Sequence, residues 1–375
     1  MKVLVTGGEG FIGSHTVDLL LESGFSVRIF DNLESQVHQG KKLEYLDTRA
    51  EFFQGDITNS DLWKKVLEKV DAIVHLAAIT GIGQSMYQPS RYVLTNVIGT
   101  AKLYETIIGN PKIKNTLHRI VIASSKTIYG EGAYVCESHG MIYPELRLEE
   151  QLIKRDWEIH CPLCKKHVKP VKINENKSIQ NLSIYALTKF CTEKLSLMYS
   201  NILEIPTTVF RYFSAYGPRQ SLNNPYTGVC SIFLCRMKNG RPPIIYEDGK
   251  QIRDFIYVQD IARANLLALE KTDKTGIYNI GSGIPTRIIS VAEMIKEICS
   301  VNIDPIVTPE YRLGDTRHDF ADISKAKREL GFEPKWEVKK GLRELARWAE
   351  TKEAMDIFER ADKERKILQR RGEGK

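Results

Sequence analysis

The chain begins with the stretch Lys2-Val-Leu-Val-Thr-Gly-Gly-Glu-Gly-Phe-Ile-Gly13, a short apolar run followed by closely spaced glycines. An apolar strand that leads through a glycine loop into a helix is how a doubly wound parallel sheet holds the pyrophosphate of a dinucleotide. The glycines allow a tight turn, a close approach of backbone to phosphate, and close packing of helix on strand. In chain order these roles fall to Gly7 or Gly8, Gly10 and Gly13. We therefore predict an α/β fold of the Rossmann type, with a strand at 3–5 and a helix at 14–23.

A second strand, expected at 27–30, ends in Asp31, 18 residues after Gly13. A carboxylate at this place can accept hydrogen bonds from both ribose hydroxyls of the adenosine and repels a 2′-phosphate. The sequence therefore predicts NAD, rather than NADP, as the cofactor.

Tyr185 and Lys189 lie four residues apart, so a helix would present both on one face. A free tyrosine has a pKa of about 10, but a neighbouring ammonium group and a positive nicotinamide ring both favour the phenolate. Tyr185 could then take a proton from a substrate hydroxyl whose carbon gives a hydride to NAD. A surface pair of Tyr and Lys is the structural alternative. The glycine loop and a serine loop at Ser124-Ser125, expected at the carboxyl edge of the sheet, favour catalysis.

Composition and charge indicate a soluble enzyme of one Rossmann domain and a smaller partner domain. The chain has 375 residues, 42% of them hydrophobic, and a net charge of +7. Because no apolar run reaches membrane-spanning length and no leader precedes the first strand, we expect a cytoplasmic protein without a membrane partner. Part of the positive charge lies in Lys363, Arg365, Lys366, Arg370, Arg371 and Lys375. A solvated terminal helix explains this tail better than a nucleic-acid partner does.

Further strands and helices alternate as a parallel sheet requires. The expected strands are 51–57, 72–76, 120–123 and 207–211, and the expected later helices are 260–270, 291–300 and 324–330. Asp56 ends the first of these strands, where it suits the adenine amino group. Segments 244–246 and 254–258 are expected to return the chain, with Arg253, to the cleft.

At this point the sequence resembles the extended short-chain dehydrogenase/reductase family, and within it the nucleotide-sugar epimerases and dehydratases. The resemblance runs from Met1 to about Trp348 and rests on ordered motifs: Thr6 to Gly13, Gly55-Asp56, His75 to Ala78, Thr95 to Thr100, Ser124-Ser125 with Tyr129-Gly130, Tyr185 with Lys189, Arg211 to Phe213 with Tyr216 to Arg219, Arg253 to Val258 with Asp260, and Asn279 to Gly283.

The resemblance implies a role for particular residues. It makes Ser125, Tyr185 and Lys189 catalytic, with Ser125 steadying a transient ketone. Tyr185 and Lys189 would also contact NAD. The other residues expected around NAD are Gly7, Gly10, Phe11, Ile12, Asp31, Asn32, Asp56, Ile57, Leu76, Ala77, Ala78 and Asn96. The substrate, a nucleotide-diphosphate sugar, would be held by Ser214, Arg219, Arg253 and Arg312. Taken alone, each arginine is as well explained by a surface ion pair.

Three positions bear on the subclass. Dehydratases of the family carry an acidic pair after the catalytic hydroxyl residue, whereas here Lys126 and Thr127 follow Ser125, so elimination lacks its acid. Ser214 stands where the family usually has Asn, which leaves the details of substrate contact open. The Tyr129 ring could line the sugar pocket or pack under its loop.

Between Gly130 and Tyr185 lie 54 residues, far more than the short connection typical of the family. This insert contains Cys136 and His139, and then Cys161 and Cys164, each pair separated by two residues, which suits a tetrahedral structural zinc site. Disulfides are the alternative, disfavoured by the expected cytosolic location. His139 is the least certain ligand, because His160 and His167 lie nearby. The remaining cysteines, Cys191, Cys230, Cys235 and Cys299, are scattered in apolar surroundings like core residues.

Such an insert resembles a branch of bacterial and archaeal 4-epimerases that includes those acting on dTDP-L-rhamnose. Epimerases of UDP-glucose or UDP-glucuronate share every catalytic residue and remain alternatives. A non-catalytic NAD-binding sensor or scaffold is a second alternative, disfavoured by the intact catalytic residues. The family habit implies a homodimer. The expected domains are 1–210 with a return segment 244–272 (Rossmann), 132–180 (zinc insert), 211–243 with 273–350 (substrate lobe) and 351–375 (basic tail).

Overall fold

A seven-stranded parallel sheet forms the centre of the molecule in the computed structural model, which describes the chain except for residues 39–45, 225, 272, 357, 360–361 and 364–375. Across the sheet the strands are β3 (Glu51–Gln54), β2 (Ser26–Asp31), β1 (Lys2–Thr6), β4 (Ala72–His75), β5 (Arg119–Ser125), β9 (Thr207–Tyr212) and β13 (Gly276–Ile280). The strand order reverses between β1 and β4, which is where doubly wound sheets bind ligands. The predicted Rossmann architecture is confirmed.

Alternate residues of the strands pack on opposite faces of this sheet. Val3 and Val5 join the core under α1 (Phe11–Glu22), α11 (Val258–Lys271) and α13 (Ser324–Leu330). Leu4 and Ile73 join the core under α3 (Ser60–Val66), α6 (Gly99–Ile108) and α9 (Ile184–Leu203). Shorter helices connect these elements: α2 (Ser35–His38), α4 (Ile82–Tyr87), α5 (Pro89–Tyr92), the π-helix η1 (Val93–Ile98), α7 (Pro111–Thr116) and the 3₁₀ helix η2 (Lys126–Tyr129).

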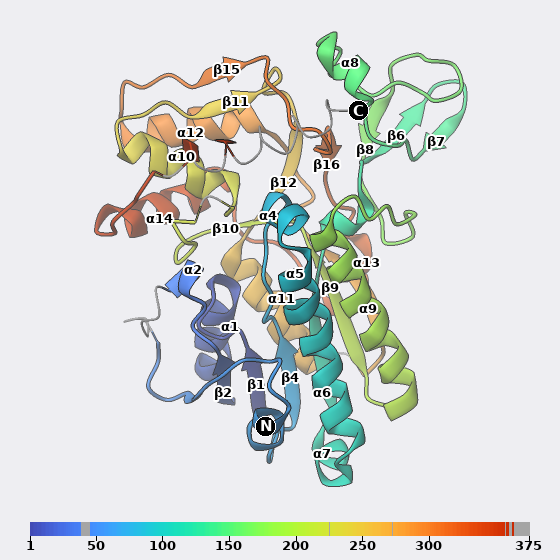
Figure 1. Cartoon of the computed structure of the whole chain (residues 1–375), viewed down its shortest axis with the longest axis vertical. Coiled ribbons are helices and arrows are strands. Elements are labelled where there is room, and N and C mark those ends of the chain that lie inside the picture. Colours follow the sequence, from blue (N-terminus) through green and yellow to red (C-terminus); the bar gives the residue numbers. More distant parts are fainter. Residues whose placement is uncertain (39–45, 225, 272, 357, 360–361, 364–375) are drawn as a thin grey trace.

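A second lobe lies beyond the carboxyl edge of the sheet (Figure 1). Its strands are β10 (Ser214–Tyr216), β12 (Ile252–Tyr257), β14 (Pro285–Arg287) and β16 (His318–Asp319), with a separate pair β11 (Ile244–Tyr246) and β15 (Ile306–Thr308). Helices α10 (Val229–Lys238), α12 (Ile288–Cys299) and α14 (Val338–Glu350) pack around a core of their own that includes Phe233, Ile295 and Leu345.

The strands cross the expected domain boundaries in two places. We expected 244–272 to return to the Rossmann half, but β11 and β12 belong to sheets of the second lobe and only α11 returns. We also expected 273–350 to be substrate lobe, but β13 pairs in parallel with β9 at the edge of the large sheet. The physical reason is that a parallel pair needs a crossover, and α11, packed beside α1, delivers the chain directly to that edge. Most of the basic segment 351–375 lies outside the described residues.

The insert forms a small unit at the same end of the molecule as the second lobe (Figure 1). It contains an antiparallel sheet of β7 (Gly140–Ile142), β6 (Ala133–Cys136) and β8 (Lys169–Val171), and the helix α8 (Glu149–Ile153). Tyr134, Ile142 and Ile159 form part of a core that is separate from the other clusters.

Buried ion pairs fasten the insert to the second lobe. Arg147 of the insert donates to both carboxylate oxygens of Glu247, at 2.8 and 2.9 Å. Arg317, fully buried, lies 2.9 Å from Glu247 and 2.5 Å from Glu158 of the insert. Because removing one partner of a buried pair leaves an uncompensated charge, these contacts hold the insert in one position.

Candidate active site

The glycine loop has no room for side chains at the places where the sequence predicts a dinucleotide. Gly7 has a φ of +66°, and a Cβ there would lie 2.9 Å from the backbone of Ala77. A Cβ on Gly13 would lie 2.0 Å from the carbonyl oxygen of Gly7. Gly10 is the N-cap of α1, so the first amides of that helix face the loop. The cradle fits the pyrophosphate of NAD, and Gly7, rather than Gly8, makes the tight turn.

The two acidic residues predicted to bind the adenosine lie at adjacent strand ends. Asp31 is buried at the end of β2 and accepts hydrogen bonds from the amides of Glu9 and Leu33, at 3.0 and 2.8 Å. Asp56, just after β3, accepts one from Asn32 Nδ2 at 2.8 Å. These bonds fix both carboxylates beside the glycine loop.

The loop after β4 is held by Thr6, which the sequence analysis did not single out as a site residue. Its Oγ1 accepts hydrogen bonds from the amides of Leu76 and Ala77, both at 3.2 Å, and lies 2.8 Å from Nδ1 of His75. Burial lowers the pKa of His75 to about 3, and the charge of Lys189 adds to this effect. His75 is therefore neutral and serves to position the loop.

Asn96 joins this loop to the helix that carries the predicted catalytic pair. It lies buried in η1, accepts a hydrogen bond from Ile79 N at 2.8 Å, and donates to Thr188 Oγ1 at 3.0 Å. Such π-turns occur often at functional sites. The other predicted cofactor residues also border the glycine loop or the strand ends: Phe11 and Ile12 in the first turn of α1, Ile57 after β3, and Ala78 after β4.

Ser125 and Tyr185 are brought together at the carboxyl edge of the sheet. Ser125 ends β5, and its Oγ accepts hydrogen bonds from the amide and hydroxyl of Thr127, at 3.2 and 3.0 Å. Tyr185 and Lys189 lie one turn apart at the start of α9, which is capped by Ser183. Burial raises the pKa of Tyr185 to about 12, against a hydrogen bond with Ser125 that lowers it. Burial also lowers the pKa of Lys189 to about 8.

The pKa of Tyr185 in the protein alone shows how much the expected phenolate depends on the cofactor. We expected the ammonium group of Lys189 and the nicotinamide ring together to favour the phenolate, and without the ring the desolvation of the phenol has the larger effect. A phenolate therefore needs a further positive charge close to Tyr185.

Below Ser124 and Ser125 lies a buried polar network that the motifs did not reveal as a unit. Ser124 Oγ donates to Glu193 at 3.0 Å, and Glu193 pairs with Arg211 at 2.6 Å. Arg211 donates to the hydroxyl of Tyr129 at 2.8 Å. Tyr129 is fully buried, so of the two interpretations left open its ring packs under the loop.

Two predicted substrate arginines lie at different sides of the cleft. Arg219 forms an ion pair with Asp18 of α1 at 2.7 Å. Arg312 is exposed, and its guanidinium lies 5.0 Å from the centre of the Tyr246 ring. Ser214, partly buried, begins β10 in the second lobe.

Arg253, the third predicted arginine, belongs to a cluster of charges next to the catalytic loop. It lies 3.0 Å from Asp315 and 3.3 Å from Asp319. Asp319 also pairs with Lys126, at 2.5 Å, and Lys126 directly follows Ser125. The sequence analysis noted Lys126 only as the residue that replaces an acid, and it missed Asp319 because that residue belongs to none of the motifs.

The four predicted metal ligands form one cluster in the insert, with all ligand atoms within 4.8 Å of one another. Nδ1 of His139 lies 3.5 Å from both Cys136 Sγ and Cys161 Sγ, and Cys136 Sγ lies 3.7 Å from Cys164 Sγ. Zn–S and Zn–N bonds of about 2.3 and 2.0 Å in a tetrahedron separate such atoms by about 3.5 to 3.8 Å. A disulfide requires about 2.0 Å. The spacing therefore fits a metal ion and not a disulfide.

The competing histidines point elsewhere. His160 lies 2.7 Å from Asp156 and 3.0 Å from the carbonyl oxygen of Lys165, and its ring packs against that of His167. His139 is therefore the histidine that completes the cluster.

Comparison with known proteins settles the family. The model of the NAD dependent epimerase/dehydratase family matches residues 3–145 and 165–281. The chain belongs to this family. It is 33% identical to a dTDP-L-rhamnose 4-epimerase of Burkholderia thailandensis, over 92% of this chain and 94% of that one. It is also 33% identical to a putative UDP-glucose 4-epimerase of Methanocaldococcus jannaschii, over 92% and 97%.

Solved structures agree with this assignment. A UDP-glucuronic acid 4-epimerase from Bacillus cereus, in complex with UDP-glucuronic acid and NAD, has a TM-score of 0.76 at 28% identity, covering 93% of this chain and 98% of that one. A UDP-glucose 4-epimerase from Thermotoga maritima with UDP-glucose has a TM-score of 0.73 at 32% identity, with the same coverage. The family predicted from the motifs is confirmed.

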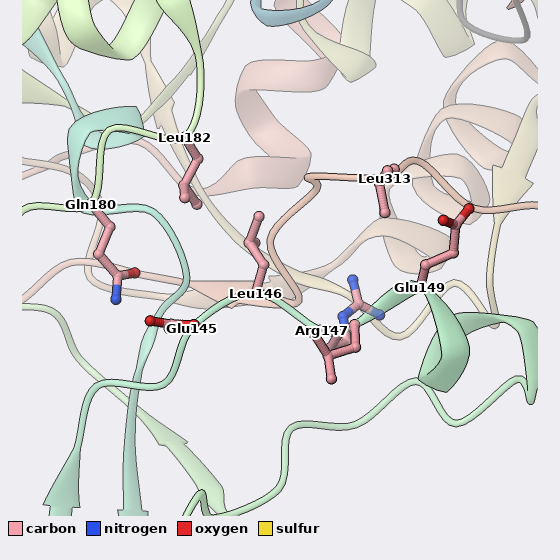
Figure 2. Close-up of a pocket in the computed structure, with 8 residues that line it drawn as sticks. Glu145, Leu146, Arg147, Glu149, Gln180, Leu182 and Leu313 are labelled. Atoms are coloured by element: carbon pink, nitrogen blue, oxygen red, sulfur yellow. The ribbon is translucent and has the colours of Figure 1, made fainter. Parts of the chain in front are cut away.

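Residues 146–164, which the family model leaves unmatched, fall inside the insert. Here the insert borders a pocket of about 390 Å³, which it shares with the loop before α9 and with Leu313 (Figure 2). Leu146 and Arg147 come from the insert, and Gln180 and Leu182 precede Tyr185 by only a few residues. The insert therefore contributes to the surface beside the loop that leads to Tyr185. Within the described residues, no helix combines the length and apolar character needed to cross a membrane.

Proposed function

We propose that this chain is an NAD-dependent nucleotide-sugar 4-epimerase that inverts a sugar carbinol through a transient 4-keto sugar. The observation that carries the proposal is the contact of Tyr185 with Ser125 at the carboxyl edge of the sheet, one helical turn from Lys189 and beside a glycine loop that fits NAD. A sensor or scaffold would not require this arrangement.

The residues of the chain divide the work of the reaction. NAD, when bound at the glycine loop, would supply the acceptor for the hydride of the sugar carbon and the donor for its return. Tyr185 takes the proton of the sugar hydroxyl and later gives it back, while Ser125 donates a hydrogen bond to the oxygen of the ketone. The pKa of Lys189 is lowered to about 8. At a pH below this value, its ammonium group places a positive charge near Tyr185. Inversion follows if the ketone presents its other face before the hydride returns.

The substrate is a nucleotide-diphosphate sugar, with the L-rhamnose of a dTDP-sugar as the first candidate. The relatives with 33% identity support this class. UDP-glucose and UDP-glucuronate remain alternatives, because enzymes named for both are similar over most of the chain. Ser214, Arg219, Arg253 and Arg312 are the proposed contacts of the diphosphate and sugar.

The insert is proposed to hold one structural zinc ion through Cys136, His139, Cys161 and Cys164. Support comes from the distances among the four ligand atoms and from the type of donors, three thiolates and one imidazole. All four positions are filled by protein, so the ion would order the insert and take no part in the chemistry. Thiols that persist in such a cluster also favour a reducing, cytoplasmic location.

A homodimer is proposed through the outer face of α9 and η1. Leu187, Met198 and Ile202 follow one face of α9 and are 42%, 61% and 62% exposed. Leu94 and Ile98 of η1 are 53% and 40% exposed. Apolar side chains gathered on neighbouring helices are typical of a surface covered by a second copy.

The proposed function is tested by assaying the purified protein with a panel of UDP-, dTDP- and GDP-sugars and separating the 4-epimers chromatographically. We expect conversion of at least one pair of epimers and no dehydrated product. Binding of NAD without conversion of any nucleotide sugar would favour the sensor.

A further inference from the structure

One oxygen of the Asp319 carboxylate is buried without a donor, although the other oxygen has several. Asp319 is 2% exposed. Its Oδ2 receives Lys126 Nζ at 2.5 Å and Thr316 Oγ1 at 3.1 Å, and it lies 3.3 Å from Arg253 Nε. Its Oδ1 has no hydrogen-bond partner among the residues that the structure describes. An unsatisfied buried carboxylate oxygen is costly and needs an explanation, such as a ligand.

The carboxylate of Asp319 contacts the residue that follows Ser125 in the chain. Asp319 ends β16, which pairs with β12 at Arg253. Its partner Lys126 directly follows Ser125, so the side chain of Lys126 connects Asp319 to the proposed catalytic loop. The side chains of Lys126 and Arg253, which both contact Asp319, are 16% and 11% exposed. Arg253 is a proposed ligand of the diphosphate, and drawing its guanidinium toward phosphate would uncover Asp319.

We infer that Asp319 is a specificity-determining residue whose Oδ1 accepts a hydrogen bond from a hydroxyl of the bound sugar. The inference rests on the proposed function and narrows its substrate class. A carboxylate oxygen can only accept, so it matches a hydroxyl and repels a second carboxylate. The substrate class is accordingly a neutral hexose or deoxyhexose linked to a nucleotide, and uronates are disfavoured.

The surrounding cations do not reverse this preference. Lys126 already faces Asp319, and Arg253 faces both Asp319 and Asp315. A uronate would have to separate one of these pairs before its own carboxylate could be neutralised. A neutral hydroxyl needs no counter-ion, so it leaves the pair of Lys126 and Asp319 in place and donates to the oxygen that lacks a donor.

Equilibrium binding tests the inference without requiring turnover. NAD-loaded protein carrying Tyr185→Phe is titrated with UDP, UDP-glucose and UDP-glucuronate, and with dTDP and dTDP-glucose as a second series. We expect tighter binding of the glucose derivative than of the uronate. Adding Asp319→Asn should weaken binding of the glucose derivative by tenfold or more and reduce its preference over the uronate, because a hydrogen bond to a charged acceptor is lost. Affinity for UDP or dTDP should change less than threefold.

The nucleotide controls separate recognition of the sugar from a merely structural role. If Asp319→Asn weakens the binding of UDP and of UDP-glucose equally, or weakens neither, the inference is overturned. Tighter binding of the uronate than of the glucose derivative to protein with Asp319 intact also overturns it. Failure of every nucleotide sugar to bind overturns the proposed function as well.

Two further variants keep the test valid if Asp319→Asn disturbs folding. Lys126→Gln combined with Asp319→Asn removes both charges of the pair while retaining a donor and an acceptor, and it should show the same loss for the sugar alone. Asp322→Asn is the matched control, because its carboxylate accepts only a local bond from the amide of Ser324 at 2.9 Å. That variant should bind all ligands like the parent protein.

Discussion

As the proposed base, Tyr185 would have to lose a proton in a place that disfavours its charged form. Burial raises its pKa to about 12, and the hydrogen bond with Ser125 only partly offsets this. At neutral pH the phenol is therefore protonated in the protein alone. A positive charge brought next to the ring favours the phenolate, so the base should become active only when the cofactor site is filled.

The first prediction concerns this residue. Tyr185→Phe should lower turnover by about 10² or more while NAD still binds, because the ring stays and only the proton acceptor is lost. Phenolate absorbance at pH 9 to 10 should increase when NAD is added to the unaltered protein, since the pKa falls from about 12. The variant should lack this increase. Unchanged turnover in the variant would remove Tyr185 from the mechanism.

A second prediction at this scale concerns Asp31 and the choice of cofactor. Its carboxylate is fixed by the amides of Glu9 and Leu33, so it cannot easily turn away from a 2′-phosphate. NAD should bind more tightly than NADP in a fluorescence titration, and Asp31→Asn should reduce the difference by removing the repulsive charge. Asp61→Asn, an acidic residue in the first turn of α3, serves as a control. Tighter binding of NADP to the unaltered protein would contradict the assignment.

At the scale of elements, the strands that carry motifs were predicted well and the assignment of later strands to sheets was not. The runs at 3–5, 27–30 and 72–76 were found because fully buried parallel strands are mostly apolar, and only Arg28 and His75 interrupt the apolar residues in these runs. The place of β13 depends on where α11 packs, and that contact joins residues far apart in the chain. The four candidate metal ligands of the insert could be predicted from the sequence, because a tetrahedral metal site often takes its ligands in pairs that are only a few residues apart in the chain. Asp319 could not be predicted as a site residue, because its partner Lys126 lies 193 residues away in the chain.

The proposed zinc site of the insert gives the third prediction. Protein purified without added metal should contain close to one zinc ion per chain by elemental analysis. Cys161→Ser combined with Cys164→Ser should abolish the metal while NAD still binds, because the insert has a core of its own, apart from that of the large sheet. Any loss of activity should then follow from disorder of the insert near Tyr185.

The matched control is Cys299→Ser, which alters a free cysteine on α12, outside the insert, and should retain the zinc. Metal-free native protein, or a disulfide that joins Cys161 to another cysteine, would contradict the assignment.

On the scale of the whole molecule, three units contribute to the proposed active site. The Rossmann half contributes Ser125 and Tyr185, the second lobe contributes Arg253 and Asp319, and the insert is fixed to that lobe through Arg147 and its partners. Because the insert borders the pocket beside the loop that leads to Tyr185, its order should matter for substrate entry more than for cofactor binding.

The last prediction concerns assembly. If the outer face of α9 and η1 is covered by a second copy, light scattering should give about twice the chain mass of 42.8 kDa. Met198→Glu combined with Ile202→Glu places charges on the two most exposed apolar residues of α9 and should yield monomers, because a charge buried without a partner is strongly unfavourable. Met355→Glu changes an equally exposed methionine, 65% accessible, after α14 and should leave the dimer intact. A native mass of one chain, or a dimer that tolerates both α9 charges, would show that this face is not the interface.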